Sequence, residues 1–185
     1  MNSEICSPCI IRCIHLFPRF KNAALIDEIR AKYDCLYSAI EPHITMAFPF
    51  ISDIDGRDIE NELRRICELQ TNFDIRTSGL DAQRGEENII SLNISAGYES
   101  ICDLHYKMHE GILHKFQTEW TIKKIYRPHI TVGRFSNNAQ LQQVLQELIQ
   151  GDYEFHARID RLYIEQIGEN QNSIIESIIP FGHFQ

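Results

Sequence analysis

The sequence predicts an α+β fold with two lobes, in which two pseudo-twofold-related halves of mostly antiparallel sheet are flanked by helices and separated by a cleft. Three observations lead to this prediction. The composition, 43% hydrophobic and 24% charged, is that of a globular protein. Segments with strand or helix periodicity alternate, and polar turns join consecutive strands. The tetrapeptide Pro-His-Ile-Thr occurs twice, at 42–45 and at 128–131. With 185 residues and no linker, the chain 1–185 should form one domain.

The first half of the chain alternates between strand and helix signals. Pro18 closes the first strand and Pro42 introduces the second, because proline interrupts regular backbone hydrogen bonding. Asp53 or Asp55 can cap the helix that follows, whose apolar residues share one face. A polar segment with a glycine favours a hairpin between the last two strands. The expected elements are a strand at 10–17, a helix at 22–34, a strand at 43–50, a helix after the capping aspartate, and strands near 73–81 and 88–95.

The second half contains the same sequence of a strand after proline and a capped helix. A long helix with an apolar stripe comes first, and Pro128 then introduces a strand. Ser136 or Asn137 can cap the helix after that strand. The expected elements are a helix at about 98–117, a strand at 129–135, a helix after the cap, and strands near 154–167 and 173–180. This order predicts antiparallel pairing through most of the sheet.

The charge balance argues against one class of partner. The chain has 18 Lys and Arg residues against 26 Asp and Glu residues, a net charge of −8. Proteins that bind long duplex nucleic acid gain affinity from many phosphate contacts, so such a partner is not expected. Small ligands or the end of a nucleic acid are compatible with a local concentration of positive charge. The densest basic stretch without an intervening acid is Lys123, Lys124, Arg127 and Arg134.

The sequence also bounds the compartment and the cofactors. No apolar run approaches the roughly 18 residues of a membrane-spanning helix, and no signal peptide is evident. We therefore expect a cytoplasmic monomer without a membrane partner, and reduced thiols at the six cysteines. Cys6 and Cys9 have the spacing of redox or zinc sites, but they precede the first strand and no second pair completes a zinc set. No metal or other cofactor is expected, and the role of Cys6, Cys9 and Cys13 stays open.

The repeated tetrapeptide is the strongest functional signal. Side chains alternate along a strand, so His43 and Thr45 share one face, and His129 and Thr131 share the equivalent face in the other half. A pseudo-twofold axis would bring the two strands side by side, and all four side chains would line one cleft. For one copy alone, the polar face of a half-buried strand would be the favoured interpretation. Two copies in matching contexts favour a functional site, because a core has no need of two buried imidazoles at equivalent points.

Two facing histidines suit in-line transfer at phosphorus. One neutral imidazole removes a proton from the attacking oxygen, and the other, protonated, donates a proton to the leaving oxygen. The ordinary pKa of histidine, near 6.5, makes both forms accessible around neutral pH. Threonine hydroxyls can donate to the phosphate oxygens, and a nearby arginine can balance the developing charge. This chemistry needs neither a metal nor a triphosphate.

At these residues the sequence resembles the 2H phosphoesterase superfamily, and most closely its 2′-5′ RNA ligase-like branch. The segment 43–48, His-Ile-Thr-Met-Ala-Phe, is similar to the family's first motif, and the segment 127–134, Arg-Pro-His-Ile-Thr-Val-Gly-Arg, to its second. The resemblance covers nearly the whole chain, and the family's order of elements is the order predicted above. The chain departs from the family at Pro49 and Phe50, where Leu-Gly is frequent, so contacts with the base or leaving group are expected to differ.

The resemblance implies a bilobal fold and chemistry on 2′,3′-cyclic phosphates or 2′-5′ linkages, at RNA ends or on small nucleotides. It also implies that His43 donates a proton, that His129 accepts one, and that Thr45 and Thr131 contact the phosphate. The leading hypothesis is a cyclic phosphodiesterase with reverse 2′-5′ RNA ligase activity. A non-catalytic nucleotide or RNA-end binding protein that uses the same cleft, and a metal-dependent or redox protein, stay open as alternatives. The substrate stays open among an RNA end, an oligoadenylate, a cyclic nucleotide and an ADP-ribose cyclic phosphate.

Three more residues are candidates for substrate binding. Arg127 and Arg134 flank the second motif. Because Arg134 follows Thr131 by three positions, a regular strand would place the two on opposite faces, unless the arginine reaches the cleft from the strand end. Phe48 could stack on a base, although such a residue is more often part of the core.

Histidines outside the motifs are interpreted mainly as structural. His15 lies on the first strand, on the same face as Cys13 and Phe17. It could be a neighbour of the cleft or a hydrogen-bonded core histidine, and we favour the second interpretation. His105 and His109 have the i, i+4 spacing of zinc ligands on a helix, but one borders the apolar stripe and the other its polar edge. We therefore do not expect a zinc site there.

Overall fold

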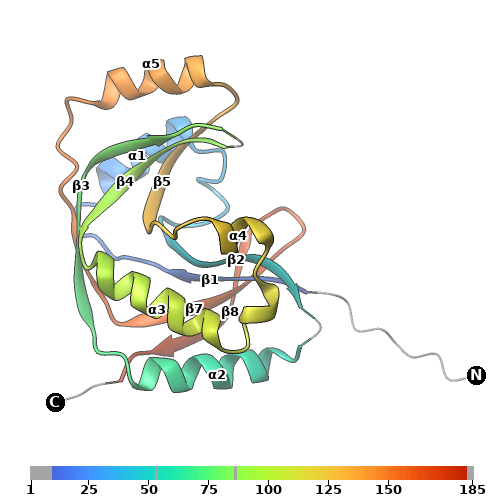
Figure 1. The fold of residues 1–185 in the computed structure, drawn as a ribbon. Helices are drawn as coiled ribbons and strands as arrows, with labels where there is room; N and C mark the ends of the chain where they lie inside the picture. Colours follow the sequence, from blue (N-terminus) through green and yellow to red (C-terminus); the bar gives the residue numbers. More distant parts are fainter. Residues whose placement is uncertain (1–9, 53, 86, 183–185) are drawn as a thin grey trace, which may run out of the picture.

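The computed structural model of the protein describes residues 10–52, 54–85 and 87–182 (Figure 1). The strands are β1 (Ile10–Leu16), β2 (Ile44–Ser52), β3 (Phe73–Gln83), β4 (Asn88–Ala96), β5 (His129–Phe135), β6 (His156–Ile159), β7 (Arg161–Ile167) and β8 (Ser173–Pro180). The helices are α1 (Ala24–Tyr33), α2 (Gly56–Glu68), α3 (Tyr98–Glu110), the 3₁₀ turn η1 (His114–Phe116), α4 (Glu119–Lys123) and α5 (Asn138–Leu148). The strands form two four-stranded antiparallel sheets, sheet 1 in the order β2-β1-β7-β8 and sheet 2 in the order β5-β4-β3-β6. The predicted α+β fold is confirmed.

The two copies of the repeated motif occupy equivalent places in the two sheets. β2 and β5 are both edge strands, and they contact each other between the sheets. A capped helix follows each of them. The side chain of Asp55 accepts from the amide of Arg57 at 2.9 Å at the start of α2, and that of Asn137 accepts from the amide of Gln140 at 2.9 Å at the start of α5. Asp53, the other candidate for the first cap, lies outside the described residues.

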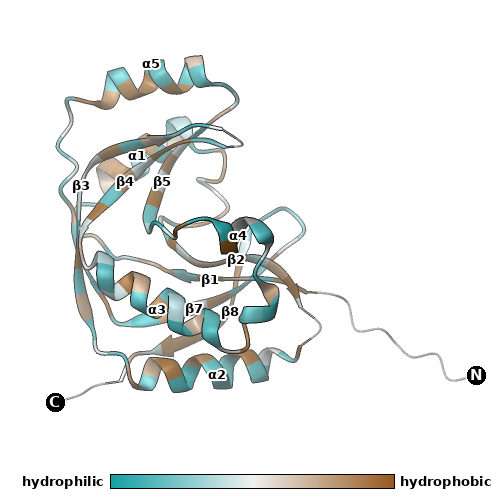
Figure 2. Ribbon diagram, viewed as in Figure 1, coloured by the Kyte–Doolittle hydropathy of each residue, from teal (hydrophilic) through white to brown (hydrophobic). Residues whose placement is uncertain are grey.

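The helices cover the two sheets from outside. α2 packs on β7 and β8, while α5 packs on β3, β4 and β5. α1 comes between two strands of sheet 1 in sequence but packs on β5 of sheet 2, so the two lobes are interlocked. Figure 2 shows hydrophobic and hydrophilic residues side by side along α2 and α5, as expected for helices with one face on a sheet.

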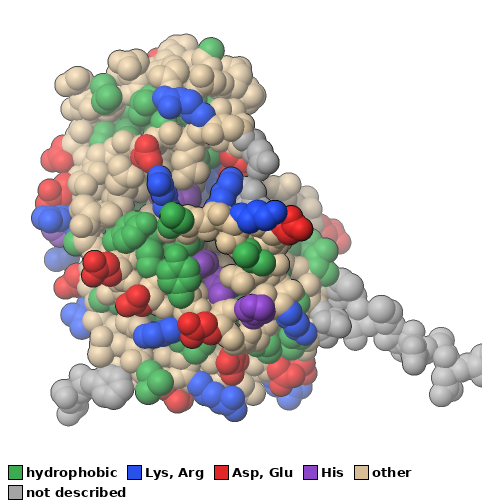
Figure 3. All heavy atoms as spheres, viewed as in Figure 1, with side chains coloured by type: hydrophobic (Ala, Val, Ile, Leu, Met, Phe, Trp, Pro, Cys, Tyr) green, Lys and Arg blue, Asp and Glu red, His purple; other side chains and the backbone are tan. Residues whose placement is uncertain are grey.

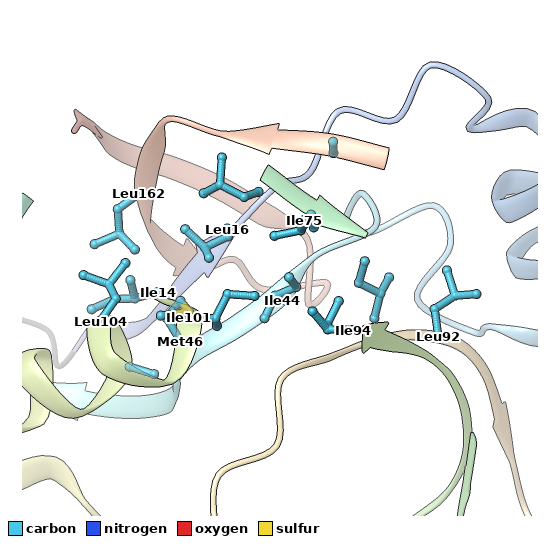
Figure 4. Packing of buried hydrophobic residues seen from close by; sticks show 14 of the residues in the cluster. Ile14, Leu16, Ile44, Met46, Ile75, Leu92, Ile94, Ile101, Leu104 and Leu162 are labelled. Carbon is cyan, nitrogen blue, oxygen red and sulfur yellow. The ribbon is translucent and has the colours of Figure 1, made fainter. Parts of the chain in front are cut away.

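Alternation along the motif strands separates the core from the cleft. Ile44 and Met46 on β2 are fully buried, and so are Ile130 and Val132 on β5. Figure 4 shows Ile44 and Met46 among the side chains that join the strands to Leu104 of α3. Each such residue stabilises the fold by roughly 1.5–3 kcal/mol through burial. The histidine and threonine of each motif consequently point to the other side of their strand.

The prediction of one helix over about 98–117 is wrong in its last third. α3 ends at Glu110, and Gly111 adopts a non-helical backbone conformation with φ −99° and ψ −135°. Glycine costs about 1 kcal/mol relative to alanine inside a helix. A side chain at position 111 would also collide with the carboxylate of Glu62. After the break, the chain forms η1 and α4, which lead back toward the second motif.

The prediction of one strand near 154–167 is also wrong, because the strand breaks at Asp160. β6 pairs with β3 in sheet 2, whereas β7 pairs with β1 in sheet 1. Before the break every second residue is buried (Phe155, Ala157, Ile159), whereas all four residues from Leu162 to Glu165 are buried after it. This change in the burial pattern marks the point at which the chain passes from one sheet to the other.

Two further observations concern membranes and thiols. Within the described ranges, no helix has the length and apolar character needed to cross a membrane. Cys13 and Cys67 are buried free thiols, and burial raises the pKa of each to about 12, so both are chemically quiet. Cys6 and Cys9 lie outside the described residues.

Candidate active site between the sheets

A cavity of about 890 Å³ opens between the two sheets. Its wall includes both motif histidines and both motif threonines, namely His43 and Thr45 beside His129 and Thr131. Part of the segment 109–124 closes a further side. Figure 3 shows histidine side chains in a hollow in the middle of this face, with Lys and Arg side chains along its border. Small-molecule sites occupy about 300–1,000 Å³, so the cavity is large enough for a nucleotide.

The two motif histidines are held in the same way. Nδ1 of His43 lies 2.8 Å from the carbonyl oxygen of Glu41, and Nδ1 of His129 lies 2.9 Å from that of Arg127. A carbonyl oxygen can only accept, so Nδ1 carries the hydrogen in both rings and Nε2 is left for chemistry. In each motif the intervening residue is proline, whose fixed φ and extended preceding residue stabilise this turn. Such an imidazole accepts a proton at Nε2 when neutral and donates from Nε2 when charged.

The surroundings favour the neutral form of both histidines. The pKa of His43 is held well below 6.5, first by burial and then by its electrostatic interaction with His15. The pKa of His129 is also lowered by burial, and the hydrogen bond to the carbonyl of Arg127 opposes this effect. A phosphate anion between the two rings would act in the opposite direction, because a nearby negative charge favours the protonated form.

A β-bulge brings Arg134 to the cavity. In the pairing of β5 with β4, the register shifts by one residue between Thr131 and Gly133, so Val132 is an extra residue on β5. A bulge changes the alternation of side chains, and Arg134 therefore lines the cavity together with Thr131. The opposite-face placement that a regular strand would give does not hold here.

The position of Arg134 is fixed by the buried carboxylate of Asp34, at the end of α1. Nη1 of Arg134 lies 2.5 Å from Oδ1 of Asp34, and Nε of Arg30 lies 2.9 Å from Oδ2. Two guanidinium groups on one carboxylate leave one net positive charge. Because Arg30 is buried and Arg134 lines the cavity, this charge is presented to the cavity by Arg134. A fixed guanidinium suits the recognition of phosphate.

The predicted basic stretch contributes only part of its charge to the cavity. Lys124 and Arg134 line it. Lys123 is exposed and pairs with a glutamate one turn earlier, at 2.9 Å. Arg127 is exposed, and its backbone carbonyl accepts the hydrogen bond from His129. The side chain of Arg127 is not part of the cavity wall formed by the described residues. The structure therefore favours Lys124 and Arg134 over the other two as contacts for an anion.

An apolar wall lies beside the motif histidines. Phe48 is 38% exposed and lines the cavity with Pro49, so it is not a core residue. Phe50 is buried, and its ring stacks on Phe116 of η1 with centroids 4.8 Å apart. The two positions at which the first motif departs from the family, Pro49 and Phe50, thus both belong to the wall of the cavity. Flat apolar side chains of this kind suit a nucleobase.

Tyr126 and His105 cover the outer edge of β2. The hydroxyl of Tyr126 donates to the carbonyl oxygen of Thr45 at 2.8 Å, and Nδ1 of His105 donates to that of Met46 at 2.8 Å. The two rings stack with centroids 3.7 Å apart and an interplanar angle of 4°. Because Tyr126 lies three residues before His129, its hydrogen bond ties the approach to the second motif to the strand of the first.

His105 and His109 each use one ring nitrogen for a hydrogen bond to the backbone. Nδ1 of each ring is hydrogen-bonded to a backbone carbonyl, that of Met46 for His105 and that of His105 for His109. Burial lowers the pKa of His105 to about 4. In the part of the chain that the structure describes, no three His, Cys, Asp or Glu side chains are grouped so that they could hold a metal ion.

One group at the cavity wall escaped the sequence analysis. Nδ1 of His15 on β1 lies 2.9 Å from Oε1 of Glu165 on β7, and both residues are buried. His15 is a hydrogen-bonded buried histidine, as interpreted, but it also lines the cavity and its ring lies against that of His43. The carboxylate of Glu165 within the otherwise strand-like run 163–167, Tyr-Ile-Glu-Gln-Ile, indicates that Glu165 needs a partner, but it does not identify His15.

Two antiparallel sheets that hold two His-x-Thr strands at one cavity define the 2H phosphoesterase class. The sequence profile described as the 2′-5′ RNA ligase superfamily matches residues 17–171 of the chain. The chain therefore belongs to the 2′-5′ RNA ligase superfamily.

Individual relatives agree with this assignment. A protein of Geobacillus sp. (strain WCH70), provisionally named a phosphoesterase, is 29% identical over 174 residues, which cover 93% of this chain and 97% of that protein. A similarly named protein of Geobacillus kaustophilus (strain HTA426) is 29% identical over 171 residues, which cover 91% and 95%. The solved structure of E. coli LigT with 3′-AMP has a TM-score of 0.63 at 13% identity, covering 95% of this chain and 99% of that one. Kluyveromyces marxianus Usb1 has a TM-score of 0.52 at 8% identity, covering 94% and 99%. At these identities, the two structures share the fold.

Proposed function

We propose that the protein is a metal-independent phosphodiesterase that hydrolyses 2′,3′-cyclic phosphates at RNA ends or on small nucleotides. The observation that carries the proposal is the matched pair of Nδ1 hydrogen bonds, which leaves Nε2 of His43 and of His129 for chemistry at one cavity. An acid and a base on two sides of a phosphate supply both proton transfers of an in-line displacement. The complex of E. coli LigT with 3′-AMP supports a nucleotide phosphate as the class of ligand.

In the proposed reaction, Nε2 of His129 takes a proton from a water molecule whose oxygen bonds to the phosphorus. The P–O bond to one ribose oxygen breaks, and Nε2–H of His43 protonates that oxygen, which leaves a phosphate monoester. The hydroxyls of Thr45 and Thr131 donate to the non-bridging oxygens, and Arg134 offsets the charge that develops on them. With the 5′-hydroxyl of another RNA end in place of water, the same groups would form a 2′-5′ linkage.

The rest of the cavity is assigned to the nucleoside. Phe48 stacks on the base, and Lys124 contacts a further phosphate of an RNA end. The small number of cavity cations, together with the net charge of −8, suits an RNA end or a small nucleotide over a long duplex. We further propose that the protein acts as a monomer, because all the groups named here come from one chain.

The direct test is turnover of nucleoside 2′,3′-cyclic phosphates by the wild type and by motif variants. His43→Ala and His129→Ala should each lower kcat by about 10²–10⁴, the usual effect of removing one positioned proton-transfer group. The double variant should lose less than the product of the single losses, because both groups act in one transition state. Thr45→Ala and Thr131→Ala remove one hydrogen bond each and should cost less. His156→Gln changes an exposed histidine that pairs with Glu154 and serves as the control.

The outcomes separate the proposal from its alternative. A chelator should leave the rate unchanged, because the two histidines carry out both proton transfers. A folded His43→Ala or His129→Ala variant with near wild-type kcat would refute the mechanism. A wild-type protein that binds cyclic nucleotides tightly and does not turn them over would establish a nucleotide-binding protein that uses the same cavity.

A further inference from the structure

A buried pair of ionisable groups lies directly behind His43 and takes no part in the proposed proton transfers. His15 and Glu165 are 4% and 1% exposed, and Nδ1 of the imidazole lies 2.9 Å from Oε1 of the carboxylate. The hydroxyl of Ser173 donates to the other oxygen of Glu165. A charged carboxylate at this depth requires a positive partner, because an unpaired charge in the interior is costly. A protonated imidazole of His15 would supply that partner.

This pair contacts the first motif through His15. The ring centroids of His15 and His43 lie 4.4 Å apart, with the planes tilted by 51°. Phe17 packs against both rings, with centroid distances of 5.9 Å and 6.1 Å. In the register of β1 with β2, His15 lies opposite Thr45. The imidazole of His15 thus adjoins both polar residues of the first motif and limits the orientations open to His43.

The charges around His43 are mostly positive. Burial is the first cause of its low pKa, the charge of His15 is the second, and two arginines add to them. Only a hydrogen bond acts in the other direction. The groups concerned are His15 on β1, Arg134 on β5, Arg30 on α1 and the carbonyl oxygen of Glu41. Glu165 is bonded to His15 and acts on His43 from behind that ring, so it stabilises the charge of His15 more than a charge on His43.

We propose that His15 and Glu165 are positioning residues for His43: the carboxylate holds His15 as a buried cation, and this cation keeps the adjoining ring of His43 oriented and neutral until a phosphate anion enters the cavity. The inference rests on the proposed function of His43. The anion offsets the charge of His15, and His43 then takes up from solvent the proton that it later donates to the leaving oxygen. Protonation of His43 is therefore coupled to substrate binding.

The test measures the protonation of His43 in the protein without substrate. The pKa of His43 is followed by NMR titration of its ring in the wild type and in the double variant His15→Gln with Glu165→Gln, which removes both charges and leaves two amides that can bond to each other. Loss of the nearer positive charge outweighs loss of the farther negative charge, so this pKa should rise by about one unit. Cys13→Ser alters the same wall without changing a charge and should leave the pKa of His43 where it is. An unchanged pKa in the folded double variant overturns the proposal.

A second measurement needs only the wild type and applies even if the double variant does not fold. Nitrogen-15 spectra at neutral pH should show both ring nitrogens of His15 protonated, whereas His43 should show the neutral form with hydrogen on Nδ1. A neutral His15 would overturn the proposal. Neither NMR experiment depends on turnover, so a failed hydrolysis assay with both NMR results intact would remove the proposed substrate and leave the relation between His15 and His43 standing.

Discussion

Removing one hydroxyl, by Tyr126→Phe, should loosen the connection between the two lobes. That hydroxyl donates the 2.8 Å hydrogen bond to the carbonyl oxygen of Thr45 on the edge of β2. Burial holds the pKa of Tyr126 well above 10, so the hydroxyl stays a donor across the working range of pH. Phenylalanine keeps the ring that stacks on His105, and the losses are this hydrogen bond and a weaker contact of the same hydroxyl with Sδ of Met46 at 3.6 Å. The loss should cost about 1–2 kcal/mol, because it leaves a half-buried acceptor without this partner.

For a domain of this size, that cost corresponds to a fall in Tm of roughly 2–8 °C. Thermal unfolding followed by circular dichroism measures it, and steady-state kinetics on a cyclic nucleotide should show kcat falling more than KM changes. The reason is that Tyr126 holds the approach to His129 against the strand of the first motif. Tyr98→Phe is the matched control, because its exposed hydroxyl lies 3.4 Å from the carbonyl oxygen of Tyr126 and also contacts Cys102, and its loss should lower stability by less than about 0.5 kcal/mol. A Tyr126→Phe variant with wild-type Tm and kcat would show that this hydrogen bond does not hold the lobes together.

Three further predictions concern the cavity. Because burial lowers the pKa of both motif histidines below 6.5, the bell-shaped profile of kcat/KM should have its maximum below pH 6.5, and the profile of kcat should lie at higher pH, since bound phosphate favours the charged forms. An optimum of kcat/KM on the alkaline side of neutrality would contradict this. Arg134→Gln should raise KM by about 10- to 100-fold, the value of a charge-assisted hydrogen bond, and reduce its dependence on salt. Arg127→Gln should change neither, and equal effects of the two would show that position in the cavity is irrelevant. Phe48→Ala should raise KM for nucleoside cyclic phosphates by about 5- to 150-fold, the value of one stacked base. The same variant should leave hydrolysis of a base-free ribose cyclic phosphate unchanged, and a similar loss on both substrates would argue against stacking.

Strand alternation and helix-capping rules, which involve only residues close in sequence, were sufficient to predict the parts of the site and fold in which the backbone is regular. Each threonine follows its histidine by two residues along a strand, so the shared face of His43 and Thr45 could be predicted from alternation alone. The caps of α2 and α5 depend on one side chain and the amide two or three residues later, which is again local. The placement of Arg134 could not be predicted in this way. The bulge at Val132 exists only in the pairing of β5 with β4, and single-sequence periodicity carries no information about that partner.

The features that sequence analysis missed depend on residues far apart in the chain. His15 and Glu165 are separated by 150 positions, so nothing near either residue indicates the other. The break between β6 and β7 depends on their pairing partners, β3 for the first strand and β1 for the second, and a continuous run of strand-like residues does not indicate that change.

The course of the chain through the two sheets implies an order of assembly. Sheet 2 uses strands from one uninterrupted stretch, 73–159, whereas sheet 1 combines strands that end by residue 52 with strands that begin at residue 161. Closing so long a loop is slower than forming local contacts. As the chain leaves the ribosome, sheet 2 can be completed while β1 still has an open edge and His15 still lacks Glu165. A nascent chain halted before β7 would contain both His-x-Thr motifs but an unfinished wall behind His43, so competence for chemistry would arrive with the last two strands to be synthesised.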